Sequence, residues 1–293
     1  MIEKLTIIGV GLIGGSLALA LKEAGQVGHM LGAGRDEANL KLAQSLGIVD
    51  AWTTSLTAAV QDADVVVLAI PMGAYDAVLA AISPALKAGC VVTDAGSTKQ
   101  HALAAAARHL PEHTHFIAAH PIAGTEQSGA AAAFSTLYQQ HLCIVTPDEK
   151  SDALALQCVK SMWQTVGCEV LEMPAAEHDD LLATVSHLPH LAAFAIVNAV
   201  QKQKCEAYDP FAFAAGGFRD FTRIASSSPS MWRDIALANR GALVKQIDGL
   251  QDELSAIKQA LLDEDDAALF AMFDAAKDAR DTWLNSSKQG EKS

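Results

Sequence analysis

Short continuous runs of apolar residues mark the first half of the chain, and segments with helical periodicity separate them. Such runs are typical of strands in a parallel sheet, because helices cover both faces of that sheet. Strand and helix signals therefore alternate as in an α/β domain. The predicted strands are residues 5–8, 29–33, 63–70, 89–93, 116–119, 142–145 and 169–171.

The second half of the chain has a different pattern. Strand signals stop after Pro174, and from Glu177 onward the apolar residues follow helical spacing. We therefore predict an α/β domain at residues 1–173 and an all-α domain at residues 174–293.

A long helix is predicted near the end of the chain. Ser228 and Pro229 suit the N-cap and first helical position, and Trp232 follows them. Further along that helix, apolar residues recur in steps of four and three, which is typical of a coiled coil. An intramolecular hairpin with the final helix and a contact between subunits both explain this seam. Its members are Leu243, Ile247, Leu250, Leu254, Ile257 and Leu261.

A glycine-rich turn joins the first strand to the first predicted helix. In GVGLIGGS, Gly9, Gly11 and Gly14 have the G-x-G-x-x-G spacing. Glycines at these positions let the backbone approach a pyrophosphate at the amino terminus of the helix, where unpaired N–H groups face the anion. The strand, turn and helix context favours a dinucleotide site over a purely structural turn. Leu12 and Ile13, which open the helix, are further candidate contacts.

The residues after the second strand bear on which dinucleotide is bound. NAD-binding domains usually carry an acid there to hold the ribose diol, whereas this chain reads Gly34-Arg35-Asp36. Space at Gly34 and the charge of Arg35 suit a 2'-phosphate, so we predict NADP. NAD is the alternative, because Asp36 could reach the diol, and Arg35 could also be a solvated loop charge. Ile70 and Pro71, where the 63–70 run ends, complete this candidate site.

Polar residues follow two further strands at the edge where open α/β sheets bind their ligands. Asp94 and Ser97 lie in DAGSTK, and His120 begins HPIAGTEQSG. We take Asp94 as a candidate cofactor contact, and His120 and Ser97 as candidate catalytic residues. The structural alternatives are a histidine that ends a strand and a serine that caps the next helix.

Two irregular motifs stand out in the helical half. SHLPH places His187 and His190 three residues apart, with Pro189 between them. A proline inside a helix costs roughly 3 kcal/mol, so we predict a kink. A histidine metal pair is the rival interpretation, but no third ligand has zinc-like spacing, and we predict no metal. The second motif, AAGGFRDFTRIA, sets a glycine pair close to Arg223.

Composition limits the partners. The net charge of -13 argues against nucleic acid and anionic membranes, because no basic run exists to collect phosphates. The chain opens without a signal peptide, and no continuous apolar run approaches the roughly 20 residues that span a bilayer. We therefore expect a cytoplasmic protein with neither kind of partner. Five scattered cysteines fit reduced thiols: Cys90, Cys143, Cys158, Cys168 and Cys205.

Taken together, GVGLIGGS, DAGSTK, HPIAGTEQSG, SHLPH and GGFRDFTR followed by MWRD resemble the TyrA family of prephenate and arogenate dehydrogenases. The resemblance runs from residue 7 to about residue 261. It implies a Rossmann-type dinucleotide-binding domain followed by an all-α dimerisation domain that forms an intertwined homodimer. Because the chain starts at its first strand and ends in helix, we expect a monofunctional enzyme.

The resemblance also implies roles for individual residues. His120 matches the catalytic histidine, and Ser97 matches the serine that orients it. Arg223 matches the arginine that binds a substrate carboxylate, and His190 lines the same pocket. Glu126 is able to pair with Arg223 as a gate. The remaining pocket positions are Thr125, Glu126, Gly216 and Trp232.

The implied reaction passes a hydride from prephenate or arogenate to NAD(P) while carbon dioxide leaves and the ring aromatises, giving 4-hydroxyphenylpyruvate or tyrosine. We expect neutral His120 to accept the hydroxyl proton with an apparent pKa near about 6.5, the usual histidine value. The second histidine of SHLPH favours prephenate or use of both substrates. Another NAD(P)-dependent dehydrogenase and a non-catalytic dinucleotide-binding redox sensor are the alternatives. The sensor would not need His120, Ser97 and Arg223 together.

Overall fold

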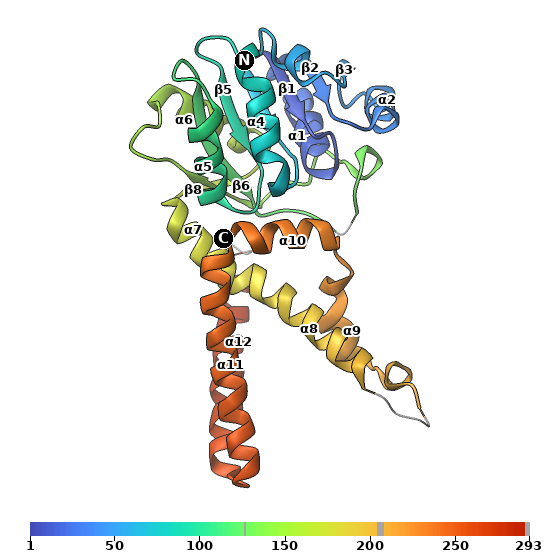
Figure 1. The fold of residues 1–293 in the computed structure, drawn as a ribbon, viewed down its shortest axis with the longest axis vertical. Helices are drawn as coiled ribbons and strands as arrows, with labels where there is room; N and C mark the ends of the chain where they lie inside the picture. Colours follow the sequence, from blue (N-terminus) through green and yellow to red (C-terminus); the bar gives the residue numbers. More distant parts are fainter. Residues whose placement is uncertain (126, 204–207, 291–293) are drawn as a thin grey trace. The chain divides into compact units, whose positions relative to one another are not determined.

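The computed structural model describes residues 1–125, 127–203 and 208–290, in two compact units, Met1–Leu243 and Val244–Ser293 (Figure 1). The strands are β1 (Ile2–Ile8), β2 (Val27–Ala33), β3 (Ala51–Thr53), β4 (Val65–Leu68), β5 (Val91–Asp94), β6 (His115–Pro121), β7 (Leu142–Thr146) and β8 (Glu169–Glu172). The helices are α1 (Leu12–Glu23), α2 (Glu37–Ser45), α3 (Leu56–Val60), α4 (Tyr75–Ile82), α5 (Lys99–His109), α6 (Ala153–Thr165), α7 (Ala175–Leu182), α8 (Leu188–Lys202), α9 (Gly216–Thr222), α10 (Pro229–Ala238), α11 (Arg240–Leu262) and α12 (Asp266–Gly290).

All the strands of the first unit form one eight-stranded sheet in the order β3-β2-β1-β4-β5-β6-β7-β8. Strands β1 to β6 are parallel, which confirms the Rossmann-type domain. Strand β7 pairs antiparallel with β6, and β8 then pairs parallel with β7. The sequence pattern had identified every strand except β3, whose three residues are too few to show a pattern.

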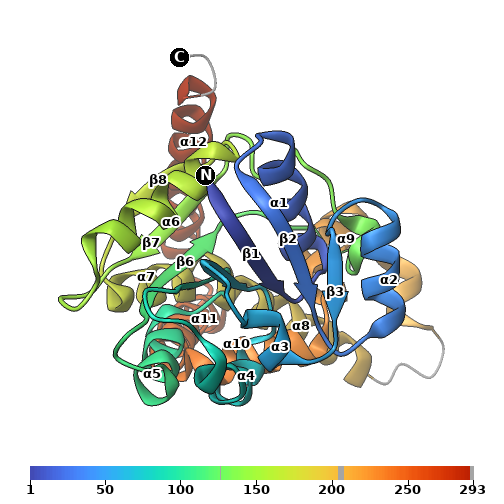
Figure 2. The ribbon, with the colours of Figure 1, turned by 90° about the horizontal axis from the view of Figure 1, so that it is seen from above.

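Helices cover the sheet on both faces (Figure 2). One buried cluster joins the sheet to α1, α2 and α6, and a second joins it to α3, α4 and α5. All four residues of β4 are buried, and so are all four of β5. Because both faces of these strands are covered, their sequences are continuously apolar rather than alternating.

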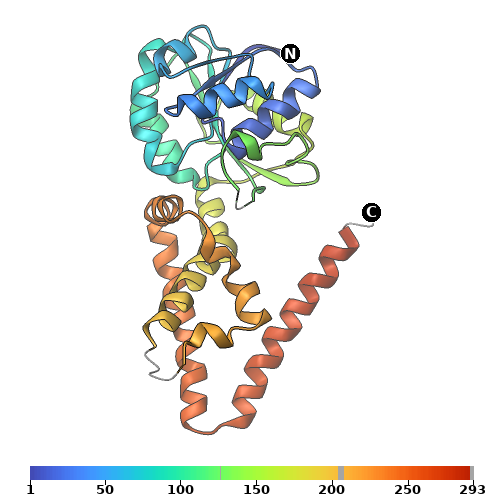
Figure 3. The same ribbon diagram turned by 90° about the vertical axis from the view of Figure 1, so that its right-hand side faces the viewer.

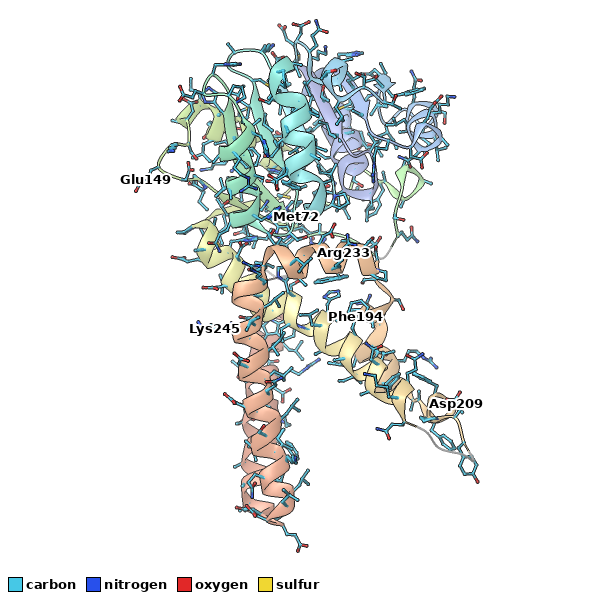
Figure 4. The ribbon with its side chains drawn as sticks, viewed as in Figure 1. Met72, Glu149, Phe194, Asp209, Arg233 and Lys245 are labelled. Carbon is cyan, nitrogen blue, oxygen red and sulfur yellow. The ribbon has the colours of Figure 1, made fainter. Side chains whose placement is uncertain are left out.

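Helix α10 belongs to the second of these clusters. Trp232 and Ile235 pack with Met72 and Tyr75 of the α/β domain. A Cβ added at Gly73 would lie 2.7 Å from a carboxylate oxygen of Asp234, so the backbone before α4 approaches α10 closely. In Figure 4, Met72 and Arg233 mark the two sides of this contact. The sheet and the first helices that follow it therefore pack as one unit.

The predicted kink at Pro189 takes the form of a wider helical turn. A π-helical turn, Ala183–His187, lies between α7 and α8, and Pro189 is in the first turn of α8. Helical turns of this kind accommodate an extra residue and are frequent at functional sites. The wider turn lies just before Pro189 and accommodates it, so the helical run continues to Lys202.

The helical run Ala175–Lys202, 28 residues long, reaches a mean hydropathy of 1.4, so its length and composition would allow it to cross a membrane. A helix of this hydropathy was not expected from the sequence, because polar residues interrupt each of its apolar runs. The first half of this helical run, however, holds His178, Asp179 and His187, which are buried and hydrogen-bonded within the first unit. Hydrogen-bonded polar residues of this kind suit a helix packed on protein better than one in lipid.

The predicted long helix after Ser228 is instead two helices. Helix α10 ends at Ala238, and α11 begins at Arg240. Between them the side chain of Asn239 donates to the carbonyl of Asp179 at 2.7 Å and contacts Nδ1 of His187 at 3.2 Å. These contacts hold Asn239 out of helical geometry, so the prediction of one helix was wrong.

The second unit holds most of α11 together with α12. Glu264, with φ +53°, lies in the turn that joins them, and the two helices diverge from that turn (Figure 3). The predicted seam is only partly covered within the chain: Leu254 is 57% exposed and Leu261 is 60% exposed. Helix α12 adds further exposed apolar side chains: Phe270, Phe273 and Trp283.

Candidate active site

The glycine-rich turn has the geometry of a phosphate-binding loop. Gly9 has φ +98°, and a Cβ there would lie 2.2 Å from the carbonyl oxygen of Ala69. A Cβ at Gly14 would lie 2.3 Å from the carbonyl oxygen of Gly9, so this glycine lets α1 pack against the turn. At Gly11 the nearest atom would be 4.0 Å away, so no protein atom requires glycine there. The open space at Gly11 suits a ligand that approaches the backbone closely.

Helix α1 begins at Leu12, directly after this turn. The first turn of any helix leaves backbone N–H groups without an intrahelical partner. The N–H groups of Leu12 and Ile13 are therefore placed to receive an anion by their backbone, whatever their side chains do. This arrangement fits a dinucleotide pyrophosphate.

A cleft of about 820 Å³ opens over the turn at the carboxyl ends of β1, β2 and β4. The structure brings seven predicted cofactor residues to its wall: Gly9, Gly11, Gly34, Arg35, Asp36, Ile70 and Pro71. Asn39, which the sequence analysis missed, also lines it and bridges the carbonyl of Val10 (2.7 Å) and the N–H of Ala130 (2.9 Å). The Asp36 side chain caps α2 by accepting the N–H of Asn39 at 3.1 Å.

Asp94 does not line this cleft, so its predicted role in cofactor binding needs correction. It is fully buried and forms an ion pair with Lys99, whose Nζ lies 2.6 Å from Asp94 Oδ2. Tyr75 donates its hydroxyl proton to the same oxygen at 2.7 Å, and the N–H of Ala119 donates to Oδ1 at 3.0 Å. Lys99 also donates to the carbonyl of Ala119 at 2.6 Å. Asp94 therefore fastens the end of β5 to the end of β6.

His120 lies near the carboxyl end of β6, as predicted, and is partly accessible to solvent. Its Nδ1 is 2.8 Å from Nε2 of His178, a buried residue of α7. His178 Nδ1 is in turn 2.8 Å from Oδ1 of Asp179. The carboxylate of Asp179 also accepts the N–H groups of Lys99 and Gln100 at 2.8 and 3.0 Å. The side chains of Asp179, His178 and His120 therefore form a hydrogen-bonded chain that ends at the candidate catalytic residue.

The surroundings keep His120 neutral. Burial lowers the pKa of His120 well below its ordinary value, and the neighbouring His178 and Lys99 act in the same direction. The expectation of a pKa near the usual histidine value therefore needs correction. The two rings meet edge to face, with centroids 5.0 Å apart. A neutral imidazole is the protonation state required of a general base.

A second group of rings lies where the π-helical turn meets α10. Trp232 stacks on His190 with centroids 3.7 Å apart, and His187 meets it edge-on at 5.9 Å. His190 Nδ1 lies 3.0 Å from the carbonyl of Ser186 and donates to it, which leaves Nε2 as an acceptor. Burial lowers the pKa of His190, and the charge of Arg223 lowers it further. Both histidines of SHLPH therefore face Trp232.

Two buried N–H groups in this ring cluster have no hydrogen-bond partner among the described residues. Burial lowers the pKa of His187 to about 4, so the ring is neutral. Because its Nδ1 accepts from Asn239, its Nε2 carries the proton. Within the part of the chain that the structure describes, this Nε2 and the indole N–H of Trp232 are buried without a hydrogen-bond partner. Unpaired buried donors of this kind can bind a carboxylate or an ordered water.

The second predicted catalytic residue, Ser97, and the other predicted substrate residues occupy more open positions. Ser97 is partly buried in the turn before α5, whose N-cap is Thr98 rather than Ser97. Arg223 is exposed where α9 ends, and its charge reaches His190. Gly216 opens α9. Thr125 accepts the N–H of Gln127 at 3.2 Å. Glu126 lies outside the described residues, and so does Cys205.

Among the described cysteines, Cys90, Cys143, Cys158 and Cys168 are free thiols. The sequence analysis missed His178 and Asp179 altogether. The signal that could have found them is EHDD, a polar stretch at the point where the strand pattern gives way to helix.

Comparison with known families agrees with this geometry. The family model "Prephenate dehydrogenase, nucleotide-binding domain" matches residues 17–172. The model "Prephenate dehydrogenase, dimerization domain" matches residues 174–275. The chain belongs to the prephenate dehydrogenase family. The cleft lies in the first of these domains, and SHLPH and Trp232 lie in the second.

Individual members of the prephenate dehydrogenase family are similar over most of the chain. The prephenate dehydrogenase of Bacillus subtilis is 36% identical over 96% of this chain and 76% of its own length. The cyclohexadienyl dehydrogenase of Zymomonas mobilis is 35% identical over 95% of each. A crystal structure of the A. aeolicus prephenate dehydrogenase with hydroxyphenyl propionate and NAD⁺ matches with a TM-score of 0.90 and 35% identity, over 96% of this chain and 98% of that one.

Proposed function

We propose that this protein catalyses the oxidative decarboxylation of prephenate, arogenate or both, with hydride transfer to NAD(P), as a step of tyrosine biosynthesis. The proposal depends on one observation: His120 lies at the carboxyl edge of the dinucleotide-binding sheet, and its surroundings keep it neutral. The likeness to prephenate and cyclohexadienyl dehydrogenases supports the same assignment. A redox sensor would have no need of a buried histidine chain at that edge.

In the proposed mechanism a bound NAD(P) would supply the acceptor for the hydride that leaves the ring carbon bearing the 4-hydroxyl. Neutral His120 takes the hydroxyl proton as general base. The bond to the departing carboxylate breaks to release carbon dioxide, and its electron pair enters the ring, which becomes aromatic. The proton held by His120 then returns to the phenolate oxygen, so the product is a phenol and His120 is neutral again. Gly11 and the start of α1 would hold the pyrophosphate, because the space beside Gly11 is open and the first turn of α1 has N–H groups without an intrahelical partner.

We assign substrate recognition to the ring cluster and Arg223. A cation is needed because the protein carries a net charge of -13, which repels a dicarboxylate from most of the surface. Arg223 pairs with a substrate carboxylate, and the acceptor on His190 serves a hydroxyl or N–H donor. Ser97, Thr125, Glu126, Gly216 and Trp232 complete the proposed site.

The test combines purified protein with both substrates and both cofactors and follows the absorbance of the reduced nicotinamide. His120→Asn keeps a hydrogen bond but cannot take the proton, so kcat should fall by roughly 10² to 10⁴ with the cofactor Kd little changed. His29→Asn, an exposed histidine of β2, is the matched control. Turnover near the parent level in His120→Asn would remove His120 from the mechanism.

We further propose that NADP is used at least as well as NAD. Arg35 lines the cleft, and Gly34 leaves its Cβ position open apart from a 3.8 Å contact to Leu40. Asp36 is the group that favours NAD, because its Oδ1 caps α2 and its other oxygen can accept a ribose hydroxyl. The relative of known structure carries NAD⁺, so NAD remains the competing cofactor.

We also propose a homodimer formed through residues 174–293, with the domain boundary at residue 173. The matching dimerization model and the exposed apolar residues of α11 and α12 support this. A cytoplasmic location without nucleic acid or membrane partners is part of the same proposal, and the strong negative charge supports it. Sedimentation that shows a stable monomer at micromolar concentration would contradict the dimer.

A further inference from the structure

Two residues behind His120 have no role in the reaction as proposed so far. His178 and Asp179 are 0% and 1% exposed, so neither is available to solvent. They connect His120 to the amino terminus of α5 through contacts of 2.8 Å between His120 and His178, 2.8 Å between His178 and Asp179, and 2.8 Å between Asp179 and the N–H of Lys99. A buried polar chain with every member paired fixes the orientation of its members.

The position of each proton in this chain follows from Asp179. Burial works against ionisation of its carboxyl, but the bonds from His178, Lys99 and Gln100 lower the pKa of Asp179. An ionised carboxylate can only accept, so His178 Nδ1 carries the proton of their bond. Burial lowers the pKa of His178, although Asp179 raises it, so His178 is neutral and its Nε2 has a lone pair. His120 Nδ1 must therefore donate to His178 Nε2.

We propose that His178, oriented by Asp179, is a positioning residue that holds His120 in the Nδ1–H tautomer and so leaves the lone pair on Nε2 for the substrate hydroxyl. The inference rests on the proposed function, in which His120 is the base. Its logic is that of catalytic triads, in which a carboxylate fixes the tautomer and orientation of a histidine. Here a second histidine stands between the carboxylate and the base.

Contacts with the α/β domain fix the hydrogen-bonded side chains of Asp179, His178 and His120 in place. Asp179 caps α5 by accepting two of its first N–H groups, so α7 is fastened to the α/β domain at the point where it presents His178. The other titratable or charged groups that act on His178 or His120 are Lys99, Asp94 and His187. A proton gained by His178 would turn its Nε2 into a donor. His120 Nδ1 would then have to accept, so its proton would move to Nε2 and the base would be lost. The fall of kcat at low pH therefore reports protonation of the His120–His178 pair and not of one histidine alone.

The first experiment reads the tautomer without any turnover. The full chain is labelled with ¹⁵N-histidine, and long-range ¹H–¹⁵N correlations are recorded at neutral pH. The His120 signals are identified by their loss in His120→Asn. We expect the proton on Nδ1 in the parent. His178→Leu should shift His120 toward the tautomer mixture of a free imidazole, whereas His178→Gln, whose amide oxygen can accept the same bond, should retain the parent tautomer.

The second experiment measures kinetics of the same variants. His178→Leu should lower kcat by roughly ten- to a thousandfold, with KM for substrate and Kd for cofactor changed by less than about threefold, because orientation of the base acts on the chemical step. If the hydrogen bond to the base is what matters, kcat of His178→Gln should be at least about tenfold higher than kcat of His178→Leu. If His178→Leu loses less than about tenfold, His178→Gln should return to the parent kcat. His29→Leu is the control, since this histidine is 49% exposed on β2.

Two results would overturn the proposal, and a third would support it. An Nε2–H tautomer of His120 in the parent overturns it. Equal losses in His178→Leu and His178→Gln with the tautomer unchanged also overturn it, because His178 would then serve packing alone. Loss of the tautomer with recovery in His178→Gln supports it. If the parent turned over neither substrate, the proposed function would fail, and the nitrogen shifts would still decide the tautomer.

Discussion

Lys99→Met removes the cation from a fully buried ion pair, and we expect it to destabilise the first unit strongly. Lys99 Nζ donates to Asp94 Oδ2 and to the carbonyl of Ala119, each at 2.6 Å, and both members of the pair are 0% exposed. Two charge-assisted bonds at roughly 1.5–3 kcal/mol each give about 3–6 kcal/mol. Removing one partner of a buried ion pair generally costs about 3–5 kcal/mol of folding free energy, in agreement with this sum. Methionine keeps the volume, so a cavity adds little.

The assay is urea and thermal unfolding followed by circular dichroism. At about 2–4 °C per kcal/mol for a unit of this size, 3–5 kcal/mol corresponds to a fall in Tm of roughly 6–20 °C. Lys41→Met is the matched control, because Lys41 pairs with Glu37 on the exposed face of α2, where such pairs contribute about 0–1 kcal/mol. A Tm for Lys99→Met as close to the parent as that of Lys41→Met would refute the reasoning. Tyr75 and the backbone donors would then suffice to hold Asp94.

Three further outcomes test the site. Because its surroundings lower the pKa of His120, kcat should stay on its plateau as the pH falls through about 6.5 and decline only below it; a rate profile with its midpoint above that value would contradict a base that these surroundings keep neutral. Arg223→Ala should raise the substrate KM roughly ten- to a hundredfold with cofactor binding little changed in initial-rate assays, and an unchanged KM would end its assignment. Gly9→Ala would set a Cβ 2.2 Å from the oxygen of Ala69 and should raise the cofactor Kd at least about tenfold by fluorescence titration. Gly25→Ala, at φ +64° but in open space, should leave the cofactor Kd unchanged, and equal effects would trace the loss to backbone strain alone.

The α/β half of the fold could be predicted because its physics is local. A strand buried on both faces is continuously apolar, as in β4 and β5, and a phosphate-binding turn needs glycines at fixed offsets, as at Gly9 and Gly14. The reversed direction of β7 could not be predicted in this way. Strand direction depends on which neighbour a strand pairs with, and a run of apolar residues carries no sign of that.

The positioning pair behind the base could not be predicted for a similar reason. His178 and Asp179 are adjacent in sequence, and adjacent residues on a helix normally point apart. Their side chains meet only because the amino terminus of α5, some eighty residues earlier in the chain, draws the Asp179 carboxylate toward its N–H groups. The burial of Lys99 could not be predicted either, because lysine is rarely buried unless it is paired. Its two partners, Asp94 and the carbonyl of Ala119, come together only where β5 and β6 end side by side.

The cofactor preference offers the last test, because it depends on a few exposed groups at the end of β2. Arg35 can offer a bidentate cation to a 2'-phosphate, whereas Asp36 can accept from a ribose diol. Arg35→Ala should therefore lower kcat/KM with NADP by roughly tenfold or more, which is about 1.4 kcal/mol, and leave the value with NAD nearly unchanged. Arg108→Ala, an exposed arginine paired with Asp76 on α4, controls for loss of a surface charge. Equal losses with both cofactors, or no loss, would mean that Arg35 does not read the phosphate, and a rise with NAD alone would point to Asp36 as the group that selects the diol.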